Sequence, residues 1–244
     1  MADFFDIYDA LIDSVGENSF VDKVYYGRHW ASASVGGSCG LAMACEGDSI
    51  RPKESFGNLP VSLKEAAAGI KSWNYPEASI SLAACNAFFN TSERLQELDC
   101  YEPYENYCTA GLDLSGLKIG LIGHLTVTPE MKEKAKEIFI IERAPKPGDY
   151  PDPACEFILP SCDIVLITGS ALINKTLPRL LELSRNAYTI LTGPSVPMCP
   201  ELLNFGIDRL AGMVVSDPDE LNIQLEKGLL GSPYPYGTSF MLKK

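Results

Sequence analysis

The stretch "GLIGHLTVTPEMKEKAKEIFIIER", residues 120–143, decides the fold of this 244-residue chain. It reads as an apolar strand that ends in a glycine, a helix capped by Thr128 and begun by Pro129, and a second apolar strand that ends at Glu142 and Arg143. Continuous Ile, Leu and Val indicate strands that are buried on both faces, as in a parallel sheet. The stretch therefore predicts the start of a doubly wound sheet with right-handed crossovers.

The same alternation continues to residue 230. The predicted strands cover 117–123, 139–143, 162–170, 188–195 and 210–217, and the predicted helices cover 128–138, 154–160, 177–186, 199–206 and 217–230. The tail, residues 231–244, is expected to wrap over the surface. The sequence thus predicts a Rossmann-like domain in the C-terminal half.

The glycine spacing argues against NAD(P) as a cofactor. A dinucleotide-binding loop has the pattern G-x-G-x-x-G, and its second glycine lets the backbone approach the pyrophosphate. Starting the pattern at Gly123 puts Leu125 and Thr128 at the other two positions, and starting it at Gly120 puts Ile122 and Leu125 there. Two of the three glycines are missing in either alignment.

The first hundred residues have a different pattern. Apolar residues have helical spacing over 3–15, and the Val- and Tyr-rich segment 20–35, which contains His29, suits a strand. A turn at 35–40 leads to a returning strand at 41–47. Helices are predicted over 60–73 and 75–90, and Ser62 and Glu65 form a capping box in the first of them. These elements predict a smaller α+β domain. With a boundary near residue 105, the expected domains are 1–105 and 106–244.

Composition excludes several functions. The 32 acidic and 20 basic residues give a net charge of -12, and no dense Lys/Arg run offsets it, so nucleic acid is not expected as a partner. The acidic start is unlike a signal peptide, and no apolar stretch approaches about 20 residues, so we expect no membrane span and a cytoplasmic location. No two of the eight cysteines have C-x-x-C spacing, and we expect reduced thiols that pack in the core: Cys39, Cys45, Cys85, Cys100, Cys108, Cys155, Cys162 and Cys199.

Polar residues gather where the predicted strands end. These segments are "GHLT" (123–126), "ER" (142–143), "TGSALINKT" (168–176) and "TGPSVP" (192–197). The ligand crevice of an open α/β sheet lies outside the carboxyl ends of its strands, so the segments are expected to converge on one site. Taken singly, their hydroxyls and amides are also ordinary helix caps and turn residues. His124 is either a metal ligand or a general acid/base, or it bonds a backbone carbonyl, and Glu142 is the candidate second metal ligand.

Five separated motifs resemble those of one family. They are "SISLAACNAFFN", "GLIGH", "IIER", "CDIVLITGSALINKTL" and "TGPSVPMCPELLNFGIDRLAG", and in this order they resemble the bacterial and archaeal family named putative heavy-metal chelation proteins. The resemblance implies an N-terminal domain similar to the enolase N-terminal fold, a Rossmann-like C-terminal domain and a ligand cleft between them. The site residues that it implies are Asn86, Asn90, Gly123, His124, Glu142, Thr168, Gly169, Asn174, Thr176, Gly193, Pro194 and Ser195.

Three functions remain open from the sequence. The first is binding of a divalent heavy-metal ion or a small metallated ligand between the two domains. The second is a metal-independent enzyme or sensor for a small organic anion or nucleotide-like ligand at the strand ends. The third is a subunit of a homo-oligomer in which the 168–195 loops form the assembly surface.

Overall fold

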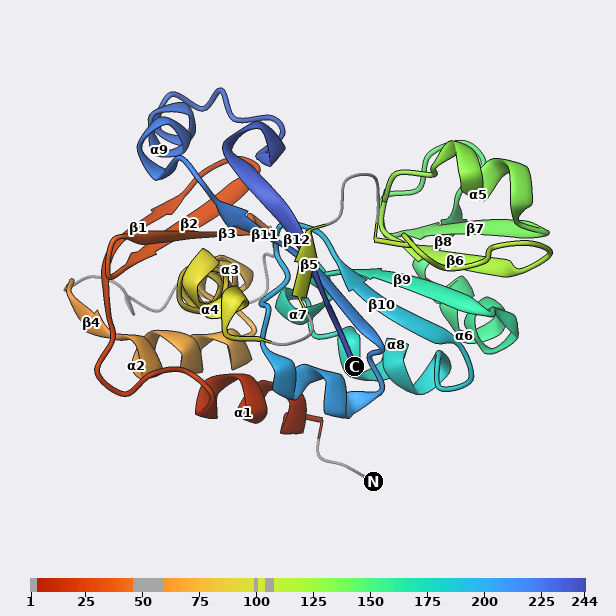
Figure 1. Ribbon diagram of the computed structural model, residues 1–244, viewed down its shortest axis with the longest axis horizontal. Helices are drawn as coiled ribbons and strands as arrows, with labels where there is room; N and C mark the ends of the chain where they lie inside the picture. Colours follow the sequence, from red (N-terminus) through yellow and green to blue (C-terminus); the bar gives the residue numbers. More distant parts are fainter. Residues whose placement is uncertain (1–3, 46–58, 99–100, 104–107) are drawn as a thin grey trace.

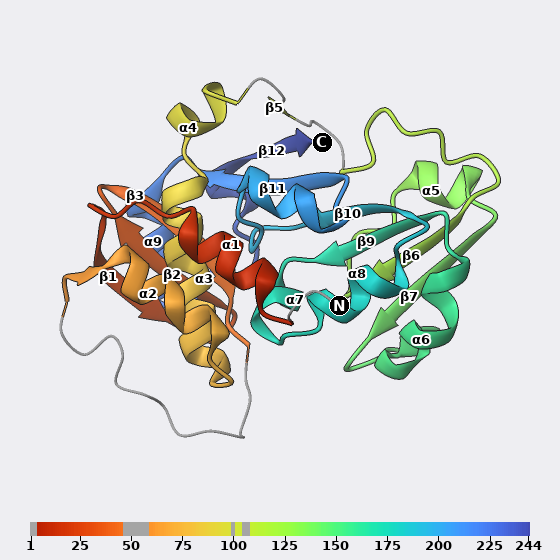
Figure 2. The ribbon, with the colours of Figure 1, turned by 90° about the horizontal axis from the view of Figure 1, so that it is seen from below.

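The computed structural model describes residues 4–45, 59–98, 101–103 and 108–244, with the backbone alone for 101–103. Its strands form a four-stranded antiparallel sheet and an eight-stranded, mostly parallel sheet, which lie beside each other in Figures 1 and 2. The predicted fold class is confirmed: the chain is an α/β protein with a small antiparallel lobe and a larger parallel one. We call them the first lobe and the second lobe.

The sheet of the first lobe has the strand order β3-β2-β1-β4. Its strands are β1 (Phe20–Tyr26), β2 (Trp30–Val35), β3 (Ser38–Met43) and β4 (Val61–Ser62). The segment 20–35 is therefore two strands, paired as a hairpin with Tyr26 opposite Ala31, and the prediction of one strand is wrong. His29 lies in the turn and is exposed, so its predicted place in a strand is wrong as well. The chain reverses at "GRH", where the N–H of Gly27 donates to the carbonyl of Trp30 at 3.0 Å.

Helix α3 (Tyr75–Phe89) packs across this sheet and is buried on nearly all sides. Asn74 caps it by accepting the backbone N–H of Glu77 at 2.9 Å. The helix lies so close to β3 that a Cβ on Gly40 would come within 2.1 Å of the backbone nitrogen of Ala87. The other helices of this lobe are α1 (Asp6–Asp13), α2 (Leu63–Ala68), η1 (Gly69–Lys71) and α4 (Ser92–Gln96), and Ser62 caps α2 as predicted.

The second sheet contains six parallel strands in the order β8-β7-β6-β9-β10-β11. Its strands are β5 (Tyr101–Pro103), β6 (Lys118–Ile122), β7 (Glu137–Glu142), β8 (Tyr150–Pro151), β9 (Ile164–Thr168), β10 (Tyr188–Thr192), β11 (Arg209–Val215) and β12 (Gly237–Lys243). Counted from β6 to β11, the six parallel strands follow the order 3-2-1-4-5-6 of a Rossmann fold. The chain reverses its direction of winding between β6 and β9, which places the switch point there.

Alternate residues of the parallel strands face two different helix layers. Leu121 and Leu166 pack in the core that includes Met131 of α5, whereas Ile122 and Ile167 pack in the core that includes Leu177 of α8. Figure 1 shows α5 above the sheet and α6 and α8 below it. The remaining helices are α5 (Pro129–Lys134), η2 (Asp152–Ala154), α6 (Cys155–Ile158), η3 (Leu159–Ser161), α7 (Ser170–Ile173), α8 (Leu177–Leu183), η4 (Pro200–Phe205), α9 (Pro218–Glu226) and η5 (Tyr234–Tyr236). Of these, α9 lies against the first lobe, where the hydroxyl of Tyr25 donates to the carbonyl of Leu225.

Several predicted helices differ in extent or type: the helix predicted over 217–230 ends at Glu226, and the one predicted over 177–186 ends at Leu183. Helix α5 ends at Lys134 and strand β7 begins at Glu137, whereas the sequence predicted helix as far as residue 138. Glu137 and Ile138 pair with Lys118 and Ile119 of β6, and this sheet pairing overrides the helix predicted for these two residues. The predicted helix at 199–206 is the 3₁₀ helix η4.

The C-terminal tail is a strand, which corrects the expectation that it wraps over the surface. Strand β12 pairs antiparallel with β11 along its whole length, from Gly237 opposite Val215 to Lys243 opposite Arg209. On its other side it pairs with β5, which precedes the boundary expected near residue 105. Phe240, Met241 and Leu242 are buried. The division into domains 1–105 and 106–244 stays a prediction.

One continuous hydrophobic core joins the two lobes. It includes Leu82 and Phe89 of α3 together with Ile167, Leu172 and Val196 of the second lobe. Among the described residues, no helix is long and apolar enough to cross a membrane.

Candidate functional site

A cavity of about 530 Å³ opens at the carboxyl ends of β6, β7, β9 and β10. It includes the switch point between β6 and β9, where a Rossmann-like sheet binds its ligands. Its second wall comes from the first lobe. The lining residues are Trp30, Met43, Cys45, Tyr75, Ile122, Gly123, His124, Leu125, Ile141, Glu142, Arg143, Ala144, Asp152, Thr168, Ser170, Ala171, Asn174, Thr176, Gly193, Pro194, Ser195 and Tyr234.

Nine of the twelve predicted site residues line this cavity. They are Gly123, His124, Glu142, Thr168, Asn174, Thr176, Gly193, Pro194 and Ser195. The predicted convergence of the strand-end segments is therefore present in the structure. Gly169, Asn86 and Asn90 are not among the lining residues.

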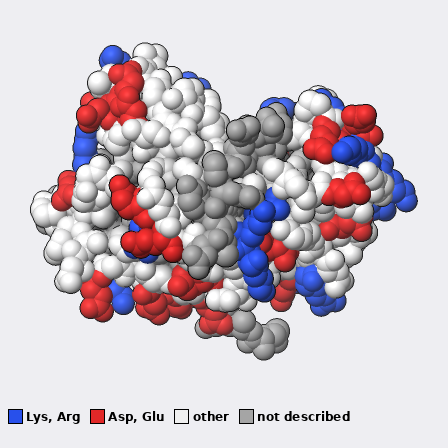
Figure 3. All heavy atoms as spheres, in the orientation of Figure 1, with Lys and Arg blue, Asp and Glu red and all other residues white. Residues whose placement is uncertain are grey.

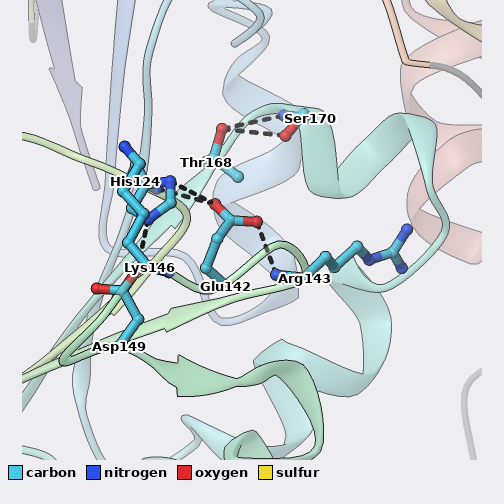
Figure 4. A network of polar contacts seen from close by, with 7 residues as sticks. All are labelled: His124, Glu142, Arg143, Lys146, Asp149, Thr168 and Ser170. Atoms are coloured by element: carbon cyan, nitrogen blue, oxygen red, sulfur yellow. Dashed lines mark hydrogen bonds and ion pairs between the residues drawn. The ribbon is translucent and has the colours of Figure 1, made fainter.

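His124 follows β6 directly and stands between two carboxylates (Figure 4). Gly123 has a φ of +99°, a conformation that favours glycine, and it turns the chain so that His124 stands beside Glu142. The imidazole Nε2 lies 2.5 Å from Oδ2 of Asp149, and Nδ1 lies 3.5 Å from Oε2 of Glu142. The side chain of His124 is 31% exposed, that of Asp149 is 8% exposed and that of Glu142 is 22% exposed. The imidazole is therefore only partly open to water.

Backbone amides fix both carboxylates. Oε2 of Glu142 accepts the N–H of His124 at 3.1 Å, and Oε1 accepts the N–H of Arg143 at 2.7 Å. Oδ2 of Asp149 accepts the N–H of Lys146 at 2.8 Å. This bond, and then the bond from His124, lowers the pKa of the Asp149 carboxyl below its usual range. Both acids are thus held as oriented acceptors around one imidazole.

Loop residues after β9 mostly bond one another. Oγ1 of Thr168 lies 3.1 Å from Oγ of Ser170, and Oδ1 of Asn174 accepts Oγ1 of Thr176 at 2.6 Å. Gly169 allows this loop to touch the loop after β10, because a Cβ there would lie 2.8 Å from the carbonyl carbon of Ser195. Gly169 therefore shapes the site from behind the cavity wall.

Asn86 and Asn90 join the lobes. Nδ2 of Asn86 donates to the carbonyls of Leu41 at 2.6 Å and Pro194 at 3.4 Å. Nδ2 of Asn90 donates to the carbonyls of Val196 and Met213, and its Oδ1 accepts the N–H of Met198 at 2.8 Å. Both residues are nearly fully buried. Their hydrogen-bond partners are backbone groups, and the buried Oδ1 of Asn86 has no partner among the described residues. Contact of Asn86 and Asn90 with a ligand stays a prediction.

The first-lobe wall was not predicted from the sequence. Trp30, Met43, Cys45 and Tyr75 line the cavity opposite the strand ends. The backbone N–H of Met43 donates to Oγ of Ser195 at 2.9 Å, which ties this wall to the second lobe. Burial raises the pKa of the Cys45 thiol to about 11, so it is a neutral thiol at neutral pH.

Asp149 was also missed; the only signal for it was its place in the polar "PKPGDY" segment after a strand.

His124 and Glu142 are the two residues that the sequence predicted as metal ligands. Among the residues that the structure describes, no group of three or more His, Cys, Asp or Glu side chains is placed to hold one. The seven described cysteines are all free, and Cys100 lies outside the described residues. Acidic and basic side chains both occur over the two lobes on the face that Figure 3 shows.

Two family models match the chain. One, described as "Putative heavy-metal chelation", matches residues 111–242, and a second with the same description matches residues 8–89. An uncharacterized protein of Methanocaldococcus jannaschii is 28% identical over 184 residues. That match covers 69% of this chain and 66% of the relative, so the chain spans just under two thirds of that protein.

Two crystal structures of proteins with unknown function are similar over the whole chain. The protein from Desulfitobacterium hafniense DCB-2 is 35% identical, with a TM-score of 0.87 over 99% of this chain and 98% of that one. The protein from Pyrococcus horikoshii is 22% identical, with a TM-score of 0.79 over 99% of both chains, and it supports the fold alone.

Proposed function

Because the chain belongs to the DUF364 family, whose description is "Putative heavy-metal chelation", we propose that its cavity binds a divalent heavy-metal ion. The observation that carries this proposal is the pair formed by Nδ1 of His124 and Oε2 of Glu142, 3.5 Å apart at the cavity wall. Two ligand bonds of about 2.1 Å at a tetrahedral angle separate their donor atoms by about 3.4 Å. The 3.5 Å between the two donor atoms is close to that separation.

Two protein ligands leave at least two positions of a tetrahedral ion open. The cavity of about 530 Å³ has the size of a small-molecule site, whereas one water takes up about 30 Å³. Trp30, Tyr75 and Tyr234 give it aromatic surface. We therefore infer that the ion is bound as a complex with a small organic molecule, which fills the cavity and supplies the remaining ligands.

The free thiols of the described cysteines favour a cytoplasmic location.

Anaerobic titration calorimetry with Ni²⁺, Co²⁺, Zn²⁺ and Fe²⁺ tests the proposal. The wild type is expected to bind one ion, and His124→Ala and Glu142→Gln are expected to bind at least about ten-fold more weakly. His29→Ala is the matched control, because His29 is exposed on the turn before β2. Equal affinity in the wild type and in His124→Ala, or no binding by either, would contradict the proposal.

The second candidate is a metal-independent enzyme or sensor for a small organic anion. The size of the cavity and the presence of Arg143 in its lining favour it. Stabilisation by organic anions that grows with their concentration and does not change when a chelator is added would support this function. Loss of that stabilisation with the chelator would support the metal complex instead.

A further inference from the structure

The imidazole of His124 is held unequally by its two acidic neighbours (Figure 4). The contact of Nε2 with Asp149 is 2.5 Å, just below the usual length of about 2.7–2.9 Å for a charge-assisted N–H···O hydrogen bond, whereas the contact of Nδ1 with Glu142 is 3.5 Å, at the limit for one. Asp149 belongs to the loop between β7 and β8 and is not among the cavity-lining residues. Asp149 contacts Nε2 without lining the cavity, while Glu142, beside Nδ1, is one of the lining residues.

The chemistry of the shorter contact fixes the position of the proton. An ionised carboxylate only accepts hydrogen bonds, and Oδ2 of Asp149 already accepts the backbone N–H of Lys146. Nε2 must therefore donate to it, because a lone pair on Nε2 would face the carboxylate oxygen at 2.5 Å. In the neutral imidazole this leaves the lone pair on Nδ1, the nitrogen beside Glu142.

We propose that Asp149 is a positioning residue that holds His124 as the Nε2–H tautomer and thereby presents the Nδ1 lone pair to the cavity. The consequence for metal binding rests on the proposed function. A metal-ligating histidine commonly donates its other N–H to a carboxylate, which orients the ring and raises its basicity. Removing such a partner typically weakens metal binding by about ten-fold to a hundred-fold.

The tautomer is measured in the metal-free protein by ¹⁵N NMR of imidazoles labelled in histidine. The chain has two histidines, so exposed His29 is an internal reference. At about pH 9, where an ordinary imidazole is neutral, the wild type is expected to show His124 with a protonated Nε2 and an unprotonated Nδ1. His29 is expected to show the averaged signals of two exchanging tautomers.

Two variants test whether Asp149 is the cause. Asp149→Ala removes the acceptor, so the His124 signals are expected to move toward the averaged values of His29. Asp149→Asn keeps the shape but weakens the acceptor, and it is expected to give an intermediate shift. Asp149→Asn also serves as a second variant in case Asp149→Ala fails to fold. A backbone spectrum that is unchanged from that of the wild type shows that a variant is folded. If His124 kept the wild-type tautomer in both folded variants, or was Nδ1–H in the wild type, the proposal would be overturned.

A Zn²⁺ titration of the same samples separates this inference from the proposed function. The inference predicts that binding moves the Nδ1 signal in the wild type and is about ten-fold weaker in both variants. A wild type that binds through Nδ1, with variants that bind equally well, overturns the role of Asp149 alone. A wild type with the expected tautomer that binds no metal overturns the proposed function, and the tautomer assignment stands.

Discussion

Asn90, at the end of α3, donates to the carbonyl of Val196 in the loop after β10 at 2.9 Å. The same side chain bonds Met198 and Met213, so a single residue of the first lobe satisfies three backbone groups of the second. Together with the bond from Met43 to Ser195, these contacts fix the cavity walls relative to each other. The loop after β10 is therefore hydrogen-bonded to the first lobe at several points beside the cavity.

Replacing Asn90 with alanine is expected to destabilise the protein. The change leaves one N–H and two carbonyls of the buried 196–213 region without their partner, and each such loss costs about 1 kcal/mol or more. We expect the free energy of unfolding in urea to fall by about 3 kcal/mol. Asn204→Ala, at an exposed position of η4, is the control and should change it by less than about 0.5 kcal/mol. An Asn90→Ala variant as stable as this control would show that these bonds do not hold the lobes together.

Gly169 is expected to tolerate no side chain. Its φ of -58° is ordinary, so the constraint is space: a Cβ would lie within 2.9 Å of the Ser195 carbonyl group and of Val196. Because backbone cannot give way like a flexible side chain, Gly169→Ala should cost about 1–3 kcal/mol in thermal or urea unfolding. Gly231→Ala is the control, since a Cβ there meets nothing within 4 Å. Equal stability of the two variants would contradict the close contact of the two loops.

Lys175 gives a prediction about pH. It is 4% exposed, its Nζ donates to the carbonyl of Ile173 at 2.7 Å, and burial lowers its pKa to about 8. The unfolded chain holds this proton up to about pH 10.4, so below pH 8 both states are charged and the folded state carries the full cost of the buried charge. Between those values the unfolded state binds more protons, and the cost disappears as the pH rises.

Lys175→Met should therefore be more stable than the wild type at pH 7, by up to about 3 kcal/mol. This advantage should shrink between pH 8 and 10.4. Comparison with the wild type at each pH cancels the titration of groups that do not interact with Lys175, whereas Cys45 and Glu77 do interact with it. Lys132→Met, at an exposed position of α5, should show no such trend. A difference between Lys175→Met and the wild type that did not vary with pH would contradict the cost of burying this charge.

Local signals in the sequence predicted the parallel sheet well. Strands of continuous apolar residues and caps such as Thr128, which accepts the N–H of Met131 at 3.0 Å, depend on neighbouring residues alone. Strand β12 could not be predicted in this way. Its segment, Gly237–Lys243, has no strong apolar alternation, and its place in the sheet depends on pairing with β11 and β5. Non-local pairing of this kind leaves no local pattern.

The site was predictable on one wall only. The rule that ligands bind at the carboxyl ends of parallel strands located His124, Glu142 and the loops after β9 and β10. The facing wall depends on how the first lobe docks, and no residue pattern near Met43 or Tyr75 reports that docking. Asn86 and Asn90 show the same limit, because the need of a buried amide for partners is visible in the sequence and the identity of those partners is not.

The central claim is that His124 and Glu142 together hold a metal ion in the cavity. Anomalous diffraction from crystals of the protein grown with Ni²⁺ or Zn²⁺ tests it most directly. We predict one strong peak about 2.1 Å from both Nδ1 of His124 and Oε2 of Glu142. A peak bound through other residues, or an empty cavity in crystals of a protein that binds the metal in solution, would contradict the claim.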